Sequence, residues 1–152
     1  MAGHGPKLEI DARDLAVTIL VTSWHTEITD ALLAGAERAL KAAGNDVYTI
    51  VRVPGAFELP LAAKWAAEDE ADAIIALGVV IQGDTPHFDY VCDAATQGLT
   101  QVQLEYGVPI GFGILTVDNA KQALDRAGLA TSKEDKGAEA VEAAITMARL
   151  RS

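Results

Sequence analysis

Four short hydrophobic segments alternate along the chain with longer segments in which apolar residues recur every three or four positions. The hydrophobic segments are rich in Val, Ile and Leu and have the length of strands that are buried on both faces, as parallel strands covered by helices are. They are Leu15–Val21, Val47–Val53, Ala73–Ile81 and Ile110–Val117. The pattern therefore predicts parallel strands separated by helices.

The segments between these strands have the period of amphipathic helices. The clearest repeats are Ile28, Leu32, Ala36 and Leu40 in one segment, and Val91, Ala95, Leu99 and Val102 in another. Two further helices are predicted after the last strand, over Ala120–Ala127 and Glu134–Leu150. Because strand and helix alternate four times, we expect an α/β domain, a three-layer sandwich around a four-stranded parallel sheet.

Residues at the predicted boundaries favour this assignment. Gly44 and Asn45 tolerate the left-handed conformation that ends a helix. Thr85 is the expected N-cap of a later helix, with Pro86 at its first position. Asp118 is the expected N-cap of the helix that follows the last strand.

The composition fits one domain with its own core. The chain has 152 residues, half of them hydrophobic, which is enough for one domain with a full core. We expect a loose tail over residues 1–14 and this single domain over residues 15–152. No apolar stretch approaches the ~20 residues that cross a bilayer. A net charge of −10 with no basic run disfavours a nucleic-acid partner.

The lone cysteine and the first residues predict the compartment. Cys92 excludes an intrachain disulfide and fits a reducing environment. Residues 1–7 lack the basic start and apolar centre of a signal peptide, so we expect a cytoplasmic protein. The 28 alanines are equally consistent with a subunit interface and with simple helix propensity.

The candidate chemistry lies after the strands, because ligands of open α/β sheets bind beyond the carboxyl ends of the strands. The four segments there are 22–25, 54–58, 82–87 and 116–119. In the third, Asp84 and Thr85 lead into a helix whose first N–H groups suit a phosphate. A neutral His87 would accept a proton as a general acid/base. The alternative is that Thr85 and Pro86 only cap a helix and that His87 is solvated.

Aromatic and charged residues after the other strands are open to two interpretations. Trp24 could stack on a flat heterocycle or only cover the edge of the core, and the same holds for Phe57 and Phe112. Glu58 could simply offset a helix dipole. The cations Arg126 and Lys136 could bind a ligand or belong to a solvated surface.

Several motifs of common enzyme classes are absent from the sequence. It has no phosphate-binding loop with Gly-Lys-Ser/Thr and no Gly-x-Gly-x-x-Gly after the first strand, so nucleotide chemistry is disfavoured. It has no His/Cys cluster with the spacing of metal ligands and no Gly-x-Ser-x-Gly elbow. We therefore expect no metal site.

The segment Gly78–Val91, with the sequence GVVIQGDTPHFDYV, closely resembles the signature of the lumazine synthases of riboflavin biosynthesis. The likeness extends over nearly the whole chain, in family order. Further matching segments are Arg52–Pro60, Ala94–Leu99, Leu124–Gly128 and Asp135–Gly137. The resemblance implies a flavodoxin-like fold and a cofactor-free condensation of 5-amino-6-(D-ribitylamino)uracil with 3,4-dihydroxy-2-butanone 4-phosphate.

The resemblance also implies roles for individual residues. His87 would shuttle protons, and Asp84, Thr85 and Arg126 would bind the phosphate substrate. The pyrimidine and ribityl chain would be held by Trp24, Ala56, Phe57, Glu58, Val79, Val80, Ile81, Phe112 and Lys136. Phe112, Arg126 and Lys136 resemble residues that this family supplies from a neighbouring subunit.

The chain departs from the family pattern at a few positions and in one connection. Trp24 replaces a frequent Phe, His25 an Asn, Asp84 a Glu or Gln, and Val117 a Thr. The connection 128–136 is longer than in relatives that form icosahedral shells, so we expect a pentamer or a pair of pentamers. Association with riboflavin synthase is a further expectation.

Two other classes of function remain open at this stage. One is a flavin- or lumazine-binding module, or an assembly subunit without turnover, which could keep Trp24 and lose His87 or Arg126. The other is a flavodoxin-like electron carrier. The presence of His87 and Arg126 favours the enzyme.

Overall fold

A computed structural model describes residues 8–151, and all four predicted strands form one parallel sheet. The order of the strands across the sheet is β2-β1-β3-β4. The strands are β1 (Val17–Thr22), β2 (Thr49–Val53), β3 (Ala73–Ile81) and β4 (Ile110–Val117). The helices are α1 (Thr26–Ala42), α2 (Leu59–Glu68), α3 (His87–Tyr106), α4 (Ala120–Leu124) and α5 (Lys136–Arg149), with a short 3₁₀ turn, η1 (Ala56–Glu58), before α2.

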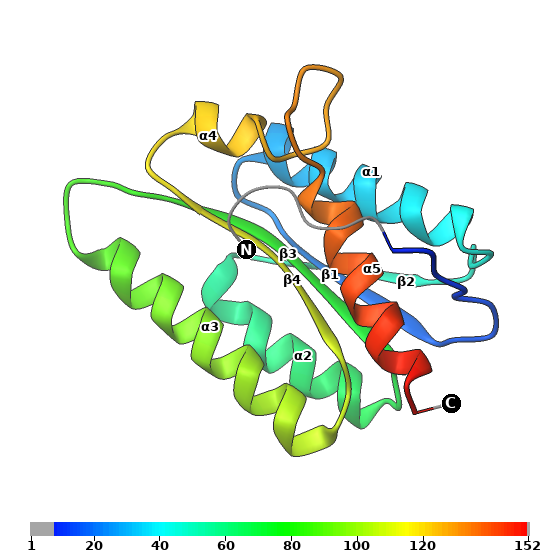
Figure 1. Ribbon diagram of the computed structural model, residues 1–152. Coiled ribbons are helices and arrows are strands. Elements are labelled where there is room, and N and C mark those ends of the chain that lie inside the picture. The colour runs from blue at the N-terminus through cyan, green and yellow to red at the C-terminus, as the bar shows by residue number, and fades with distance from the viewer. Residues whose placement is uncertain (1–7, 152) are drawn as a thin grey trace.

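Helices cover both faces of the sheet (Figure 1), with α1 and α5 on one face and α2 and α3 on the other. Alternate side chains of each inner strand therefore enter different cores. Ile19 and Val21 pack in the core beneath α1 and α5, whereas Leu20 packs with Leu59 of α2. The predicted three-layer α/β sandwich in a single domain is confirmed.

One prediction about the strands is wrong: β2 is not buried on both faces. Residues 49–52 are exposed, and in this strand only Val53 is buried. The cause is position, because β2 lies at the edge of the sheet and no helix covers its start. The hydrophobic run 47–53 could not distinguish an edge strand from a central one.

Asn45 explains why β1 and β2 begin two residues later than predicted. Its side-chain amide donates hydrogen bonds of 2.9 Å to the carbonyls of Ala12 and Leu15, and its oxygen accepts one of 3.1 Å from the N–H of Val47. The backbone of these residues is thus bound to a buried side chain rather than to a neighbouring strand. Gly44 adopts the left-handed conformation, with φ +89°, just after the end of α1, as predicted.

The N-cap of α4 and the start of α5 differ from the prediction, whereas α4 begins at Ala120 as predicted. The N-cap of α4 is Asn119, whose side chain accepts from the N–H of Gln122 at 2.9 Å, and Asp118 does not fill this role. The helix predicted to begin at Glu134 begins at Lys136, because the Asp135 carboxylate accepts from the N–H of Ala138 and caps it.

The segment that precedes β1 is bound to the domain. Ala12 is fully buried and donates its N–H to the carbonyl of Ala43. Arg149 of α5 donates to the carbonyls of Asp11 and Arg13. The sequence predicts a loose tail over residues 1–14, whereas Asp11, Ala12 and Arg13 are hydrogen-bonded to the domain. Residues 1–7 of the predicted tail lie outside the described residues. Within the described chain, no helix is both long and apolar enough to cross a membrane.

Candidate functional site

A cavity of about 670 Å³ opens at the carboxyl ends of β1 and β3. This is the point where the strand order reverses, since the chain moves from β1 to β2 on one side and then returns to β3 on the other. The loops that follow the strands gather at this end of the sheet, at the upper left in Figure 1. The cavity is lined by Trp24, His25, Gly55, Ala56, Phe57, Glu58, Val79, Val80, Ile81, His87, Tyr90 and Val91.

The loop after β1 brings an indole and an imidazole to the cavity. Trp24 is 67% exposed, so it is not a core residue that merely closes the edge of the sheet. His25 has φ +55°, in the left-handed region. This turn lets its carbonyl accept from the N–H groups of Ile28 and Thr29, so α1 is capped by backbone. The imidazole takes no part in capping and lines the cavity instead.

The loop after β2 is fixed against the loop after β1. Ser23 donates its hydroxyl to the carbonyl of Val53 and its N–H to that of Pro54. Within this loop, Glu58 Oε2 accepts from the N–H of Gly55 at 3.0 Å and closes the turn η1. Glu58 lies at the N-cap of α2 rather than in its first turn, so its observed role is this hydrogen bond. These hydrogen bonds fix the loop as one wall of the cavity, on which the Phe57 ring is exposed.

The third wall consists of the end of β3 and the start of α3. Val79, Val80 and Ile81 provide an apolar surface, and His87 is the first residue of α3. The N-cap of α3 is Pro86 and no side chain caps the helix, so the prediction of Thr85 as N-cap and Pro86 as the first helical residue is wrong by one position. The hydroxyl of Thr85 accepts from the N–H of His87 at 3.4 Å. The imidazole of His87 thus shares one cavity with the indole of Trp24.

Four cavity residues were not among the predicted site residues: His25, Gly55, Tyr90 and Val91. Tyr90 and Val91 follow His87 by three and four positions, which places all three on one face of α3. Their spacing from His87 could have identified Tyr90 and Val91 as cavity residues from the sequence. His25, which the sequence analysis noted only as a departure from a family pattern, also lines the cavity.

Five of the predicted site residues do not line the cavity of their own chain. Asp84 and Thr85 are exposed in the loop that leads to α3. Phe112, which is 49% exposed on the edge strand β4, lies in a separate groove of about 270 Å³ beside α3. Arg126 lies on the connection from α4 to α5, and Lys136 is the first residue of α5.

Arg126 and Lys136 belong to one cluster of charges at the start of α5. Nε of Arg126 lies 3.6 Å from Glu134 Oε2, and Nζ of Lys136 lies 3.0 Å from Glu134 Oε1 and 3.2 Å from Glu139 Oε1. Burial alone would lower the pKa of Lys136, but the carboxylates of Glu134 and Glu139 outweigh it and raise this pKa above the ordinary value. Lys136 is therefore a cation at neutral pH.

The cavity combines the parts that a condensation of two small molecules needs. Aromatic rings and an apolar wall can hold a flat heterocycle, and His87 can transfer protons at the start of a helix whose N–H groups favour an anion. Within the described chain, no group of three or more His, Cys, Asp and Glu side chains is arranged to hold a metal ion. The lining is mainly apolar and aromatic, and its titratable side chains are His25, Glu58, His87 and Tyr90.

Comparison with known proteins gives a consistent result along the whole chain. Residues 14–152 match the family model of 6,7-dimethyl-8-ribityllumazine synthase. The 6,7-dimethyl-8-ribityllumazine synthase of Kineococcus radiotolerans is 63% identical, with 99% of this chain and 95% of the relative covered. That of Streptomyces coelicolor is 56% identical, with 100% and 96% covered. The chain therefore belongs to the 6,7-dimethyl-8-ribityllumazine synthase family.

Proposed function

We propose that this protein condenses 5-amino-6-(D-ribitylamino)uracil with 3,4-dihydroxy-2-butanone 4-phosphate to 6,7-dimethyl-8-ribityllumazine, in riboflavin biosynthesis. Family membership over 139 residues of sequence supports the reaction. The observation that carries the proposal is the convergence of Trp24, η1 and His87 on one cavity at the switch point of the sheet. These groups come from three separate loops, and each matches a need of the reaction.

The reaction consists of two condensations and one elimination. The 5-amino group of the pyrimidine attacks the ketone carbon, and one water leaves as the imine forms. Removal of the proton on C3 then expels inorganic phosphate from C4 and leaves an enol, which takes up a proton at C4 and loses its hydroxyl proton to give a carbonyl at C3. The ribitylamino nitrogen attacks the carbonyl carbon so formed at C3, and a second water leaves as the ring closes. Each step moves a proton, so the catalyst must position two substrates and shuttle protons.

The walls of the cavity account for binding of the pyrimidine. The Trp24 indole would stack on its ring, and backbone groups of Ala56–Glu58 and Val79–Ile81 would hydrogen-bond to its edge and to the ribityl chain. His87 would take the proton released by the attacking amine and return one to the leaving water.

The phosphate substrate would bind at the mouth of the cavity. Thr85 and the first N–H groups of α3 supply donors, with Asp84 beside them, and Arg126 supplies a planar guanidinium that can grip a phosphate with two hydrogen bonds. In an acidic protein these donors must supply the local positive potential.

A neighbouring subunit would complete the site. Arg126, Lys136 and Phe112 do not line the cavity of their own chain, and Phe112 is half exposed on the edge strand β4. We therefore propose a homo-oligomer built of pentamers, as a single pentamer or a pair, with each site at an interface. The proposal also places the protein in the cytoplasm, with riboflavin synthase as a candidate partner.

An assay with both substrates tests the proposal. We expect the purified protein to form a fluorescent lumazine well above the spontaneous rate, and native mass spectrometry to show a multiple of five chains. Turnover at the spontaneous rate would refute the enzymatic assignment. A protein purified with one bound flavin per chain and no turnover would support a binding module instead.

A further inference from the structure

An acidic side chain, Glu134, lies between the two cations of the proposed interface site. It is only 9% exposed, and its two carboxylate oxygens face Arg126 and Lys136 separately, at 3.6 Å and 3.0 Å. Removing a carboxylate from water costs free energy, which pairing with nearby cations offsets. One buried anion therefore fixes the separation of the two cations.

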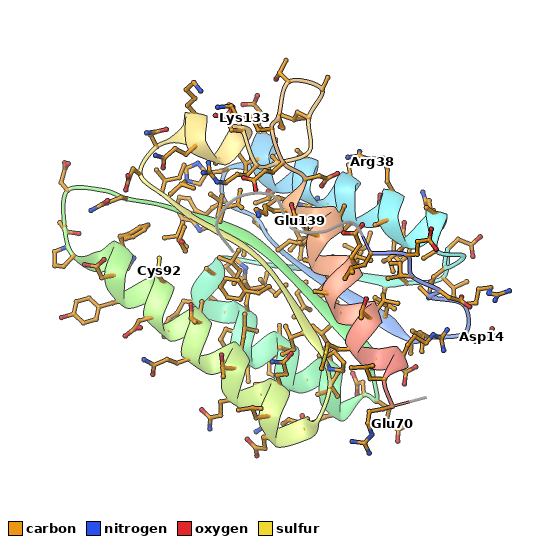
Figure 2. The ribbon with its side chains drawn as sticks, viewed as in Figure 1. Asp14, Arg38, Glu70, Cys92, Lys133 and Glu139 are labelled. Carbon is orange, nitrogen blue, oxygen red and sulfur yellow. The ribbon has the colours of Figure 1, made fainter. Side chains whose placement is uncertain are left out.

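The backbone around Glu134 is held by four hydrogen bonds to the preceding turn. The N–H groups of Lys133 and Glu134 both donate to the carbonyl of Asp125, and the carbonyl of Glu134 accepts from the N–H of Gly128. Lys136 donates its N–H to the carbonyl of Arg126. Figure 2 labels Lys133 on this connection and Glu139 in the first turn of α5. The carboxylate of Glu134 is thus presented from a rigid frame.

The position of the Arg126 side chain depends on Glu134 more than that of the Lys136 side chain does. Its side chain is 40% exposed, and besides the contact with Glu134 its Nη1 donates to the carbonyl of Gln122 at 2.8 Å. These two contacts hold different nitrogens and so define the plane of the guanidinium. Without Glu134, one contact would remain and the plane could rotate about it. Lys136 would keep Glu139 at 3.2 Å.

We propose that Glu134 is a positioning residue for the phosphate substrate: its carboxylate orients the guanidinium of Arg126, which then binds the phosphate of the substrate. This inference rests on the proposed function. A carboxylate near a phosphate site also lowers the positive potential there, and removal of its charge alone would strengthen phosphate binding. If Glu134 acts by orienting Arg126, its neutralisation should raise the KM for the phosphate substrate. If it acts only through its charge, the same substitution should lower this KM.

Steady-state kinetics of the full-length oligomer with Glu134→Gln separates the two effects. We expect the KM for the butanone phosphate to rise by about tenfold, with the KM for the pyrimidine changed by less than about twofold. Glu139→Gln is the matched control, since it removes the carboxylate that contacts Lys136 but not Arg126. It should leave the KM for the butanone phosphate within about twofold. A lower KM in Glu134→Gln, or an equal rise in both KM values, overturns the proposal.

Two more variants test whether Glu134 acts through Arg126. In Arg126→Ala the further change Glu134→Gln should add nothing to the KM for the phosphate substrate, because the group to be oriented is gone. Glu134→Asp keeps the charge and should give an intermediate KM for the butanone phosphate. It replaces the Gln variant in this test if that variant does not assemble. Additive effects in the double variant refute the positioning role. An unchanged KM in Arg126→Ala alone refutes instead the phosphate assignment of the proposed function.

Discussion

Arg38 of α1 and Asp135, the N-cap of α5, are joined by a hydrogen-bonded ion pair of 3.2 Å between Nη2 and Oδ2. The same nitrogen of Arg38 donates to the carbonyl of Gly128 at 3.2 Å. Gly35 and Gly128 leave no room for a Cβ beside the Asp135 carboxylate. The connection that carries Arg126, Glu134 and Lys136 is therefore attached to α1 through one acidic side chain.

Asp135→Ala should lower the free energy of unfolding by about 1–2 kcal/mol, because α5 loses its cap and Arg38 its partner. Asp135→Asn is the control, since the amide oxygen can still cap α5 while the charge is lost, and it should lose less than half as much. Urea unfolding of the oligomer at fixed concentration measures both. Equal losses in the two variants would show that the ion pair, rather than the cap, carries the stability.

His87→Ala should lower kcat by about 10²-fold, the lower range for loss of a general acid/base, while the affinity for the pyrimidine stays nearly unchanged. His87 is at the first turn of α3, where its side chain does not hold the core together. Product fluorescence gives kcat, and titration with the pyrimidine alone gives the affinity. Unchanged kcat would remove the proton-transfer role.

Thr22→Val should leave the protein equally stable or more stable by about 1 kcal/mol. Thr22 is 1% exposed, and its hydroxyl has no hydrogen-bond partner among the described residues. Valine has the same shape without the buried polar group, whose desolvation is unfavourable.

Thr29→Val is the matched control for this substitution. Thr29 is equally buried, but its hydroxyl donates to the carbonyl of His25 at 3.3 Å. The substitution should therefore cost about 1 kcal/mol. Thermal unfolding compares the two variants, and similar losses in both would contradict the prediction.

His25→Val should cost about 1–3 kcal/mol, because a β-branched side chain is strained at φ +55°. His25→Asn should be as stable as the parent, since Asn tolerates the left-handed region. The imidazole is exposed, so loss of packing contributes little to either result. Chemical unfolding distinguishes the variants, and equal stability of both would show that the turn relaxes at no cost.

Alkylation of Cys92 by iodoacetamide should be slower than that of a free thiol at neutral pH. Partial burial and the nearby carboxylates of Asp89 and Asp93 raise the pKa of this thiol, so less of it is thiolate. The rate should increase as the pH rises beyond the ordinary thiol value of about 8.5. Asp93→Asn should shift this pH profile to lower pH; an unchanged profile would show that Asp93 does not raise the pKa of the thiol.

The sequence predicted the third and fourth strands well, because each is a continuous run of mostly apolar residues. Ala73–Ile81 and Ile110–Val117 agree with β3 and β4 to the residue. It misplaced the starts of β1 and β2, since the decisive contacts come from Asn45, which is distant in sequence from Ala12 and Leu15. It also could not show that β2 is exposed, because burial of an edge strand depends on what packs beside it.

The sequence predicted part of the candidate site, and the remainder required the tertiary structure. Trp24, Phe57, Glu58 and His87 could be proposed from their positions just after strands, because parallel strands deliver such residues to one edge of a sheet. The hydrogen bond of Glu58 to Gly55 and the exposure of Trp24 required the folded chain.

By itself, the sequence determined the α/β architecture, the strand ends that carry the chemistry and the likeness to one enzyme family. These follow from local patterns: hydrophobic period, turn residues and a conspicuous motif. Only the tertiary structure decided that His87 and Trp24 share a cavity while Arg126 and Lys136 lie elsewhere, gathered around Glu134. Distances between side chains on separate loops depend on how the layers pack, and no local pattern encodes them.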